Sequence, residues 1–274
     1  MLLLHLMSQI FPQKIRVIYI DHQLQSKSAE WGEFVAKQAT HLNIPYTIQK
    51  VQVTDGNLEA QARQARYQAY LQHLQANEIL VLAHHQQDQA ETVILRLLSG
   101  AGVDGLAAMQ SIDHRVDMTI WRPFLDLTRE QIAEWTTQLE IEYVVDPTNY
   151  DIHYDRAWSR EELWPFLQNR FPKMQQALSR TSYLMQDASE ILEEVLKADL
   201  QNCGTDECLD LTQLLELSSA RQRQLLSVWM KGDGQYRPAF EMVERLKNEV
   251  IVSKSDAQAA LHWNQFYYVR YQHH

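Results

Sequence analysis

Cysteine is almost absent from this chain of 274 residues, which contains only Cys203 and Cys208. Two neighbouring thiols without nearby histidines match neither a zinc site nor a disulfide framework. No apolar run reaches the roughly 18 residues that a membrane-spanning helix needs. The apolar opening MLLLHLM has no basic flank and no small-residue cleavage site, so it does not resemble a signal peptide. These absences favour a soluble, cytoplasmic protein without membrane contacts.

Positive charge is also scarce, because 25 lysines and arginines face 35 aspartates and glutamates, for a net charge of -10. Nonspecific binding of nucleic acids depends on the neutralisation of phosphates by basic side chains. An acidic chain therefore disfavours a broad nucleic-acid surface. Any contact with RNA would use a local patch or recognition of shape.

Apolar strand-like runs and amphipathic helical segments alternate in the first half of the sequence. The strands are predicted at 15–20, 46–53, 79–83, 119–124 and 143–149, and the helices at 28–42, 57–75, 87–98 and 127–140. This alternation predicts an α/β fold, with a parallel sheet flanked by helices.

The pattern becomes helical from about residue 160. Helices are predicted at 173–200, within 209–231 and at 238–252, before a final aromatic strand near 261–271. We therefore expect an α/β domain over residues 1–158 and a helical domain over residues 159–274.

Polar residues follow the predicted strands at their carboxyl ends, where ligands bind in parallel sheets. These residues are Asp21, His22, His84 and His85. Asp88 and Glu91 follow three residues apart on one face of the next helix. Two carboxylates near His84 could hold a cation, orient an amine or accept protons. Alternatively, the carboxylates only favour the helix dipole, or His84, His85 and Asp88 bind a metal.

Arginines form a second candidate group. Arg63 and Arg66 lie three residues apart in EAQARQARY, a spacing that suits phosphate or carboxylate recognition from one helix face. The alternative is a solvated face on which Glu59 pairs with Arg63. The polar segment 146–160, which contains Arg156 and Arg160, could line a cleft or be a plain linker. The YYVRY segment could stack bases or pack as an edge strand.

The order of these motifs resembles one known family. D-H-x-L at 21–24, EAxARxxRY at 59–67, AHHxxDQxET at 83–92, Arg122-Pro123 and D-P-T-N at 146–149 follow one another along the chain. Together they are similar to the tRNA(Ile)-lysidine synthetase family of PP-loop ATPases, over almost the whole length. The resemblance implies a PP-loop (adenine nucleotide alpha hydrolase-like) α/β domain and a C-terminal helical substrate-binding domain.

The same resemblance implies a reaction and its participants. Family members use ATP and Mg²⁺ to adenylate the wobble cytidine of the tRNA(Ile) anticodon, and the ε-amine of free lysine then displaces AMP. A homodimer is also suggested by the family.

Roles for the candidate residues follow from this reaction. Asp88 and Glu91 are expected to bind the lysine ammonium and help deprotonate it, while His84 orients the site. Four arginines are expected to contact phosphate or the substrate carboxylate: Arg63, Arg66, Arg156 and Arg160. Asp21 and His22 are expected at the nucleotide, and no metal ligands are assigned.

The sequence also departs from the family pattern. The SGGxDS loop that cradles pyrophosphate would precede the opening helix, and it is not in this chain. Asp21 stands where the family has histidine, Ala157 where it has asparagine, and Glu162 where it has a basic residue. We therefore expect weak or no ATP-dependent activity from the chain as written.

Two other functions remain open. One is a non-catalytic tRNA-binding paralogue, and the other is a metal-dependent phosphoesterase that uses Asp21, His22, His84, His85 and Asp88. A tRNA thiolase is disfavoured by the lack of suitably placed cysteines.

Overall fold

The structure is a computed structural model that describes residues 1–54, 58–232, 234, 237–254 and 259–272. The chain divides into two compact units, Met1–Gln186 and Asp187–His274. The sequence predicted a boundary at residue 158, whereas the helices between residues 159 and 186 pack within the first unit.

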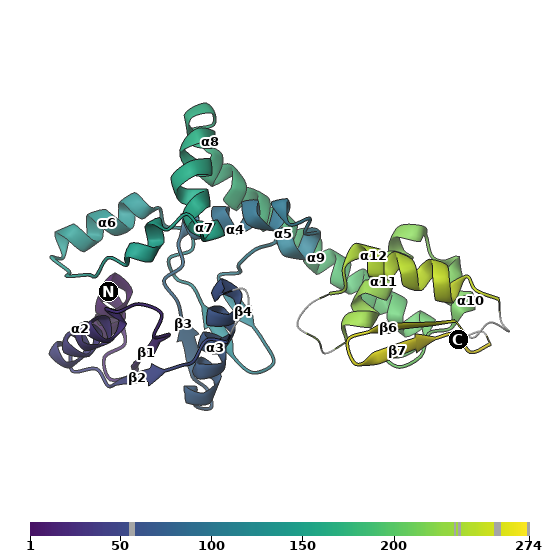
Figure 1. Cartoon of the computed structure of the whole chain (residues 1–274), viewed down its shortest axis with the longest axis horizontal. Coiled ribbons are helices and arrows are strands. Elements are labelled where there is room, and N and C mark those ends of the chain that lie inside the picture. Colours follow the sequence, from purple (N-terminus) through teal and green to yellow (C-terminus); the bar gives the residue numbers. More distant parts are fainter. Residues whose placement is uncertain (55–57, 233, 235–236, 255–258, 273–274) are drawn as a thin grey trace. The chain divides into compact units, whose positions relative to one another are not determined.

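The strands of the first unit are short and mostly parallel (Figure 1). β1 (Val17–Asp21) pairs in parallel with β2 (Tyr46–Lys50), and β3 (Ile79–Val81) pairs in parallel with β5 (Thr119–Trp121). β4 (Ile112–His114) joins β5 in an antiparallel hairpin. Within the described residues, the strands form a two-stranded and a three-stranded sheet. The expected parallel α/β arrangement is confirmed, as two sheets.

Helices alternate with these strands as the sequence predicted. They are α1 (Leu2–Ile10), α2 (Ser28–His41), α3 (Leu58–His73), α4 (Gln86–Leu98), α5 (Val103–Leu106) and α6 (Arg129–Gln138). α3 packs Tyr67 and Tyr70 against Leu80 of β3 and Ile120 of β5. Thr128 caps α6, because its side chain accepts a hydrogen bond from the Gln131 N–H at 3.2 Å.

The predicted strand at 143–149 is wrong. Tyr143 and Val145 are exposed in a segment without regular secondary structure, and a short 3₁₀ helix, η1 (Pro147–Tyr150), follows it. The β-branched run suits a strand, but in the described chain no strand lies beside it to supply hydrogen bonds. Pro147 also lacks the N–H that a ladder would use.

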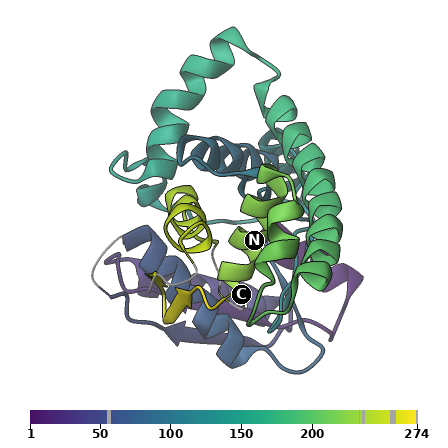
Figure 2. The same cartoon turned by 90° about the vertical axis from the view of Figure 1, so that its right-hand side faces the viewer.

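A chain of helical segments completes the first unit. It contains α7 (Asp155–Trp158), the π-helical turn η2 (Ser159–Leu163), α8 (Trp164–Arg170) and the first part of α9 (Met174–Cys203). Figure 2 shows α8 and α9 as a helical hairpin. Trp164 and Met174 pack against Ala90 and Ile94 of α4. Pro165 has no N–H to donate to the carbonyl four residues before it, which favours the wider π turn there.

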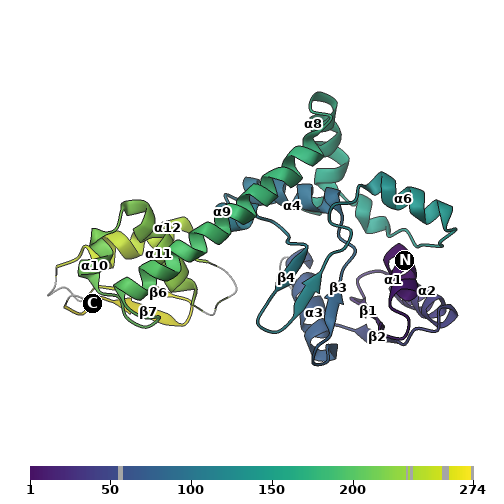
Figure 3. The same cartoon turned by 180° about the vertical axis from the view of Figure 1, so that it is seen from behind.

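The second unit is mainly helical, as predicted, around a core that includes Leu196, Leu214 and Leu225. Its remaining elements are α10 (Leu211–Glu216), α11 (Ser219–Lys231), α12 (Phe240–Arg245), the π-helical turn η3 (Leu246–Ile251), β6 (Ala260–Trp263) and β7 (Phe266–Val269). The predicted final strand is a hairpin, with β6 and β7 beside α11 and α12 (Figure 3). In the described part of the chain, no helix has the length and apolar character needed to cross a membrane.

Candidate functional site

The expected acidic pair, Asp88 and Glu91, lies in the first two turns of α4, directly after β3. The Asp88 carboxylate accepts a hydrogen bond from the His85 backbone N–H at 3.0 Å, so it does favour the start of the helix. Asp88 is 9% exposed and Glu91 is fully buried. Burial of ionised carboxylates is costly unless a cation or several donors compensate for the lost water.

Arg160 supplies that compensation. Its Nε lies 2.6 Å from one Glu91 oxygen, and its Nη2 lies 2.9 Å from the other Glu91 oxygen and 3.0 Å from Asp88 Oδ1. Gln87 donates a further bond to Glu91 at 3.0 Å. Burial alone would lower the pKa of Arg160, but its bonds and the charges of both carboxylates raise it. We call Asp88, Glu91 and Arg160 the Arg160 cluster.

The Arg160 cluster differs from the role that the sequence predicted for Arg160. The expectation was contact with phosphate or substrate carboxylate, whereas this guanidinium binds two carboxylates of its own chain. The π turn η2 places Arg160 opposite α4, in a sequence segment 69 residues beyond Glu91. Such single π turns are frequent at functional sites.

His84 is held neutral beside this cluster. Burial lowers its pKa to about 4, and the charges of Arg122, Arg156 and Arg63 act in the same direction against the opposing effect of Asp88. Its Nδ1 is buried and has no hydrogen-bond partner in the described part of the chain. A neutral imidazole with an open nitrogen can orient a polar ligand, but it is a weak base at pH 7.

Two of the expected arginines, Arg63 and Arg156, carry charges that lower the pKa of His84. The pKa of Arg63 is lowered first by burial and then by the charges of Arg156, Arg66 and Arg115, while Tyr67 opposes this effect. Guanidinium groups repel one another, so such a grouping suits an anionic ligand. We call Arg63, Arg66, Arg115, Arg122 and Arg156 the arginine group. Glu59, the alternative partner of Arg63, has a side chain outside the described structure.

Asp21 and His22 lie at the carboxyl end of β1. Asp21 is 2% exposed, and its Oδ1 accepts a hydrogen bond from the Gln23 N–H at 2.8 Å. Burial lowers the pKa of His22, and the charge of Arg66 lowers it further. Arg66 therefore connects this end of the sheet with the arginine group. Its Nε and the Nδ1 of His22 are both buried without hydrogen-bond partners among the described residues.

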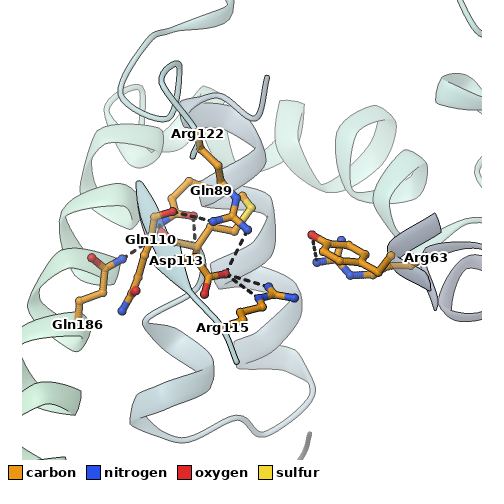
Figure 4. Close-up of polar contacts among 9 residues, drawn as sticks. Arg63, Gln89, Gln110, Asp113, Arg115, Arg122 and Gln186 are labelled. Atoms are coloured by element: carbon orange, nitrogen blue, oxygen red, sulfur yellow. Dashed lines mark hydrogen bonds and ion pairs between the residues drawn. The ribbon is translucent and has the colours of Figure 1, made fainter. Parts of the chain in front are cut away.

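Sequence reasoning missed the side chains that complete the arginine group. Arg122 is 1% exposed and donates to the Gln110 carbonyl at 2.8 Å. Asp113 lies 2.9 Å from Arg115 and 3.4 Å from Arg122, and Figure 4 shows both arginines directed at it. Burial would raise the pKa of Asp113, but the two arginines lower it. Arg122-Pro123 belonged to the motif series, whereas nothing in the pattern indicated Asp113 or Arg115.

A metal centre finds no support in the described residues, where no three histidine, cysteine, aspartate or glutamate side chains are grouped to hold an ion. His84, His85 and Asp88 are neighbours, yet the Asp88 carboxylate is engaged by Arg160 and by the His85 backbone. The five residues of the phosphoesterase alternative are thus not grouped as a ligand set in the described part of the chain. Cys203 is buried and Cys208 exposed, both in the second unit.

Two family models match the chain. Residues 1–167 match the PP-loop domain, and residues 209–274 match the TilS substrate binding domain.

Curated relatives agree with these models. The chain is 64% identical over 272 residues to a tRNA(Ile)-lysidine synthase of Acinetobacter baylyi, covering 99% of this chain and 59% of the relative. It is 34% identical over 275 residues to the enzyme of that name from Actinobacillus pleuropneumoniae, covering 99% of this chain and 65% of the relative. The chain thus spans about three fifths of the length of these relatives.

One solved structure is similar in fold. The U34-tRNA thiolase NcsA from Methanococcus maripaludis aligns with a TM-score of 0.52 and 15% identity, over 67% of this chain and 68% of the thiolase. At that identity the likeness concerns the fold alone.

Proposed function

Because the chain belongs to the tRNA(Ile)-lysidine synthase family, we propose that it carries the site for ATP-dependent ligation of lysine to the wobble cytidine of the tRNA(Ile) anticodon. The observation that carries this proposal is the buried acidic pair held by Arg160, beside a His84 on which the charges of Arg63, Arg122 and Arg156 also act. Carboxylates suit the cationic amine of lysine, and guanidinium groups suit phosphates. The reaction brings both kinds of ligand to one carbon atom.

The reaction balances in two steps. The C2 oxygen of cytidine attacks the α-phosphorus of ATP and pyrophosphate leaves. The ε-amine of lysine then attacks C2, and the oxygen departs with AMP. The amine has a pKa near ~10.4 in water and must lose its proton before it attacks. A carboxylate beside the amine can hold the ammonium and assist this proton loss.

Asp88 and Glu91 take different parts in this proposal. Glu91 is fully buried, and its two carboxylate oxygens accept hydrogen bonds from Nε and Nη2 of Arg160. Glu91 therefore fixes the position of that guanidinium. Asp88 lies at the edge of the cluster and shares a single bond with Arg160. We therefore assign the lysine ammonium to Asp88, and a positioning role to Glu91 and Arg160. His84 stays neutral and orients the reacting groups.

Arg63, Arg66 and Arg156 are assigned to the phosphates and to the carboxylate of free lysine. Asp21 and His22 are assigned to the nucleotide at the end of β1. A magnesium ion usually rests on one or two carboxylates and the substrate's phosphates. Asp21 is a buried carboxylate at this end of the sheet and fits such an ion. Bound magnesium would supply charge neutralisation of the phosphates.

The proposal is tested by lysidine formation on tRNA(Ile) with ATP, magnesium and labelled lysine. The 274-residue chain is compared with a form that carries an SGGxDS-containing segment before Met1. We expect the extended form to incorporate lysine, and Asp88→Asn to reduce incorporation at least tenfold. Asp187→Asn, which changes an exposed aspartate of α9, is the matched control.

Three outcomes separate the candidate functions. Incorporation by either form that depends on Asp88 supports the synthase. Binding of tRNA(Ile) by both forms without ATP binding or incorporation favours the non-catalytic paralogue instead. Absence of both tRNA binding and incorporation rejects the two together.

A further inference from the structure

The exposed part of the arginine group is organised around one aromatic ring. The Arg63 guanidinium lies 4.9 Å from the centre of the Tyr67 ring, and the Arg115 guanidinium lies 5.1 Å from it. Arg63 and Tyr67 are one turn apart on α3, whereas Arg115 comes from the turn between β4 and β5. Tyr67 also packs on the core residues of β3 and β5. Two separate elements thus present positive charge around a fixed ring.

Each cation at this ring is held in place. The Tyr67 hydroxyl lies 3.4 Å from Arg63 Nη2, and attraction to the ring face offsets part of the repulsion between the guanidinium groups. Arg115 makes bonds of 2.9 and 3.1 Å to Asp113. Within the described residues no carboxylate pairs with Arg63. Among the described residues, Asp113 is thus shared by Arg115 and the buried Arg122, while Arg63 has no carboxylate, so positive charge is left over.

The buried side supplies a second, independent observation. Arg122 has a side chain that is 1% exposed, and its Nε has no hydrogen-bond partner among the described residues. The Nε of Arg66 is also buried and has no hydrogen-bond partner among the described residues. Unpaired buried donors are costly, and an anionic ligand that reached them would satisfy them. In a protein with a net charge of -10, a local excess of cations marks a place for a polyanion.

We propose that Arg115, with Arg63 and Tyr67, binds a phosphodiester of an unpaired nucleotide next to the modified cytidine. This inference rests on the proposed function and adds a contact that the motif series does not contain. The charge of Arg63 lowers the pKa of His84, the residue that the proposed function assigns to orienting the reacting groups. In this proposal the phosphate of the neighbouring nucleotide contacts two guanidinium groups, and the base of that nucleotide stacks on an exposed guanidinium plane. Because this nucleotide is linked to the cytidine, holding it in place also positions the cytidine.

Arg115 makes this proposal testable without unfolding the protein. Its side chain is 38% exposed, and Arg122 keeps Asp113 paired when Arg115 is removed. The probe is a stem–loop RNA with the anticodon loop of tRNA(Ile), and affinity is measured as a function of salt. We expect Arg115→Ala to weaken binding about tenfold, the effect of one charge-assisted contact. The slope of log affinity against log salt should become shallower by about 0.7, the value for one phosphate of a single strand.

Arg180→Ala is the matched control, because it removes an exposed arginine of α9 outside the arginine group. Equal losses in the Arg115 and Arg180 variants would overturn the inference, since they would reflect overall charge. An unchanged slope in Arg115→Ala would do the same, because the contact would then not be to phosphate.

Lysidine formation separates this inference from the proposed function, and it is measured with the same variants in the form that carries the SGGxDS-containing segment before Met1. Full lysidine formation by Arg115→Ala, with unchanged RNA affinity, rejects the phosphate contact and leaves the synthase intact. Absence of RNA binding and of lysidine formation in the unmodified protein rejects both. Tyr67→Phe, which keeps the ring, is expected to retain affinity within about threefold, since the ring rather than the hydroxyl orients the guanidinium groups.

Discussion

At the scale of single residues, the Arg160 cluster is the feature on which the candidate site depends. A buried ion pair is strongly destabilised when one partner is removed, because the other charge is left without water or a counter-ion. Glu91 is fully buried, and three of its close contacts come from Arg160 and Gln87. The cluster therefore links α4 to η2.

Arg160→Ala is expected to lower the free energy of unfolding by about 3 kcal/mol, because Glu91 remains buried without its cation. Arg160→Lys restores the charge but not the two-pronged geometry, so an intermediate loss is expected. Urea denaturation measures both. Arg245→Ala, which removes an exposed pair with Glu249, is the control and should cost less than about 0.5 kcal/mol. Similar losses in the two alanine variants would contradict a structural role for the Arg160 cluster.

His84 makes stability depend on pH. Its pKa of about 4 in the folded protein lies below the ordinary value of 6.5. Between those values the unfolded chain binds a proton that the native His84 does not, so stability falls as the pH drops from 6.5 towards 4. The loss is on the order of 2–3 kcal/mol at pH 4. His84→Gln should flatten this dependence, whereas His114→Gln, at an exposed position, should leave it unchanged.

At the scale of elements, strands and helices with strong apolar patterns were predictable, and weakly patterned ones were not. β1, β2, β3 and β5 follow apolar or alternating runs in the sequence. β4 was missed, since its three residues contain one apolar side chain, Ile112, and it forms only by pairing with β5. The strand predicted at 143–149 did not form although it contains β-branched residues, because such residues form a strand only beside a partner strand.

The candidate site was also predictable only where its residues are close in sequence. Asp88 and Glu91 could be paired from sequence, because three residues separate them on one helix. Their partner Arg160 could not be assigned from sequence, since its contact depends on the π turn η2 and on packing across a long sequence separation. Arg115 was missed for a similar reason, as its place beside Tyr67 depends on the unpredicted β4–β5 hairpin.

The turn that ends α9 depends on one glycine. Gly204 has φ of +146°, and a Cβ atom there would collide with the carbonyl oxygen of Cys208. Gly204→Ala is expected to destabilise the second unit by about 2 kcal/mol or more, because a side chain strains the backbone and displaces the Thr205–Cys208 hydrogen bond. Gly102→Ala is the control, since nothing described lies within 4 Å of its added Cβ. Thermal unfolding followed by circular dichroism compares them, and equal midpoints would contradict the strain.

At the scale of the whole molecule, charge is distributed unevenly. The net charge of -10 opposes general attraction of RNA, while the five residues of the arginine group lie in the first unit, where the charges of Arg122, Arg156 and Arg63 act on His84. Under the proposed function, recognition of tRNA would therefore depend on a small number of phosphates and on the shape of the loop rather than on a long-range field.

Salt titration of RNA binding tests this distribution. Five guanidinium groups limit the phosphate contacts, so the slope of log affinity against log salt should be no steeper than about -3.5. A slope near -7 would mean that a larger basic surface takes part. Fluorescence anisotropy with the anticodon stem–loop between low and moderate salt gives the value directly.

The Arg160 cluster also sets how a cationic substrate can enter. Two carboxylates and one guanidinium leave a single negative charge in the cluster. Under the proposed function, an incoming ammonium would share the Asp88 carboxylate with Arg160 instead of filling an empty negative pocket. Arg160 offsets part of the attraction, so lysine should bind modestly and leave readily, and a neutral amine should bind more weakly still.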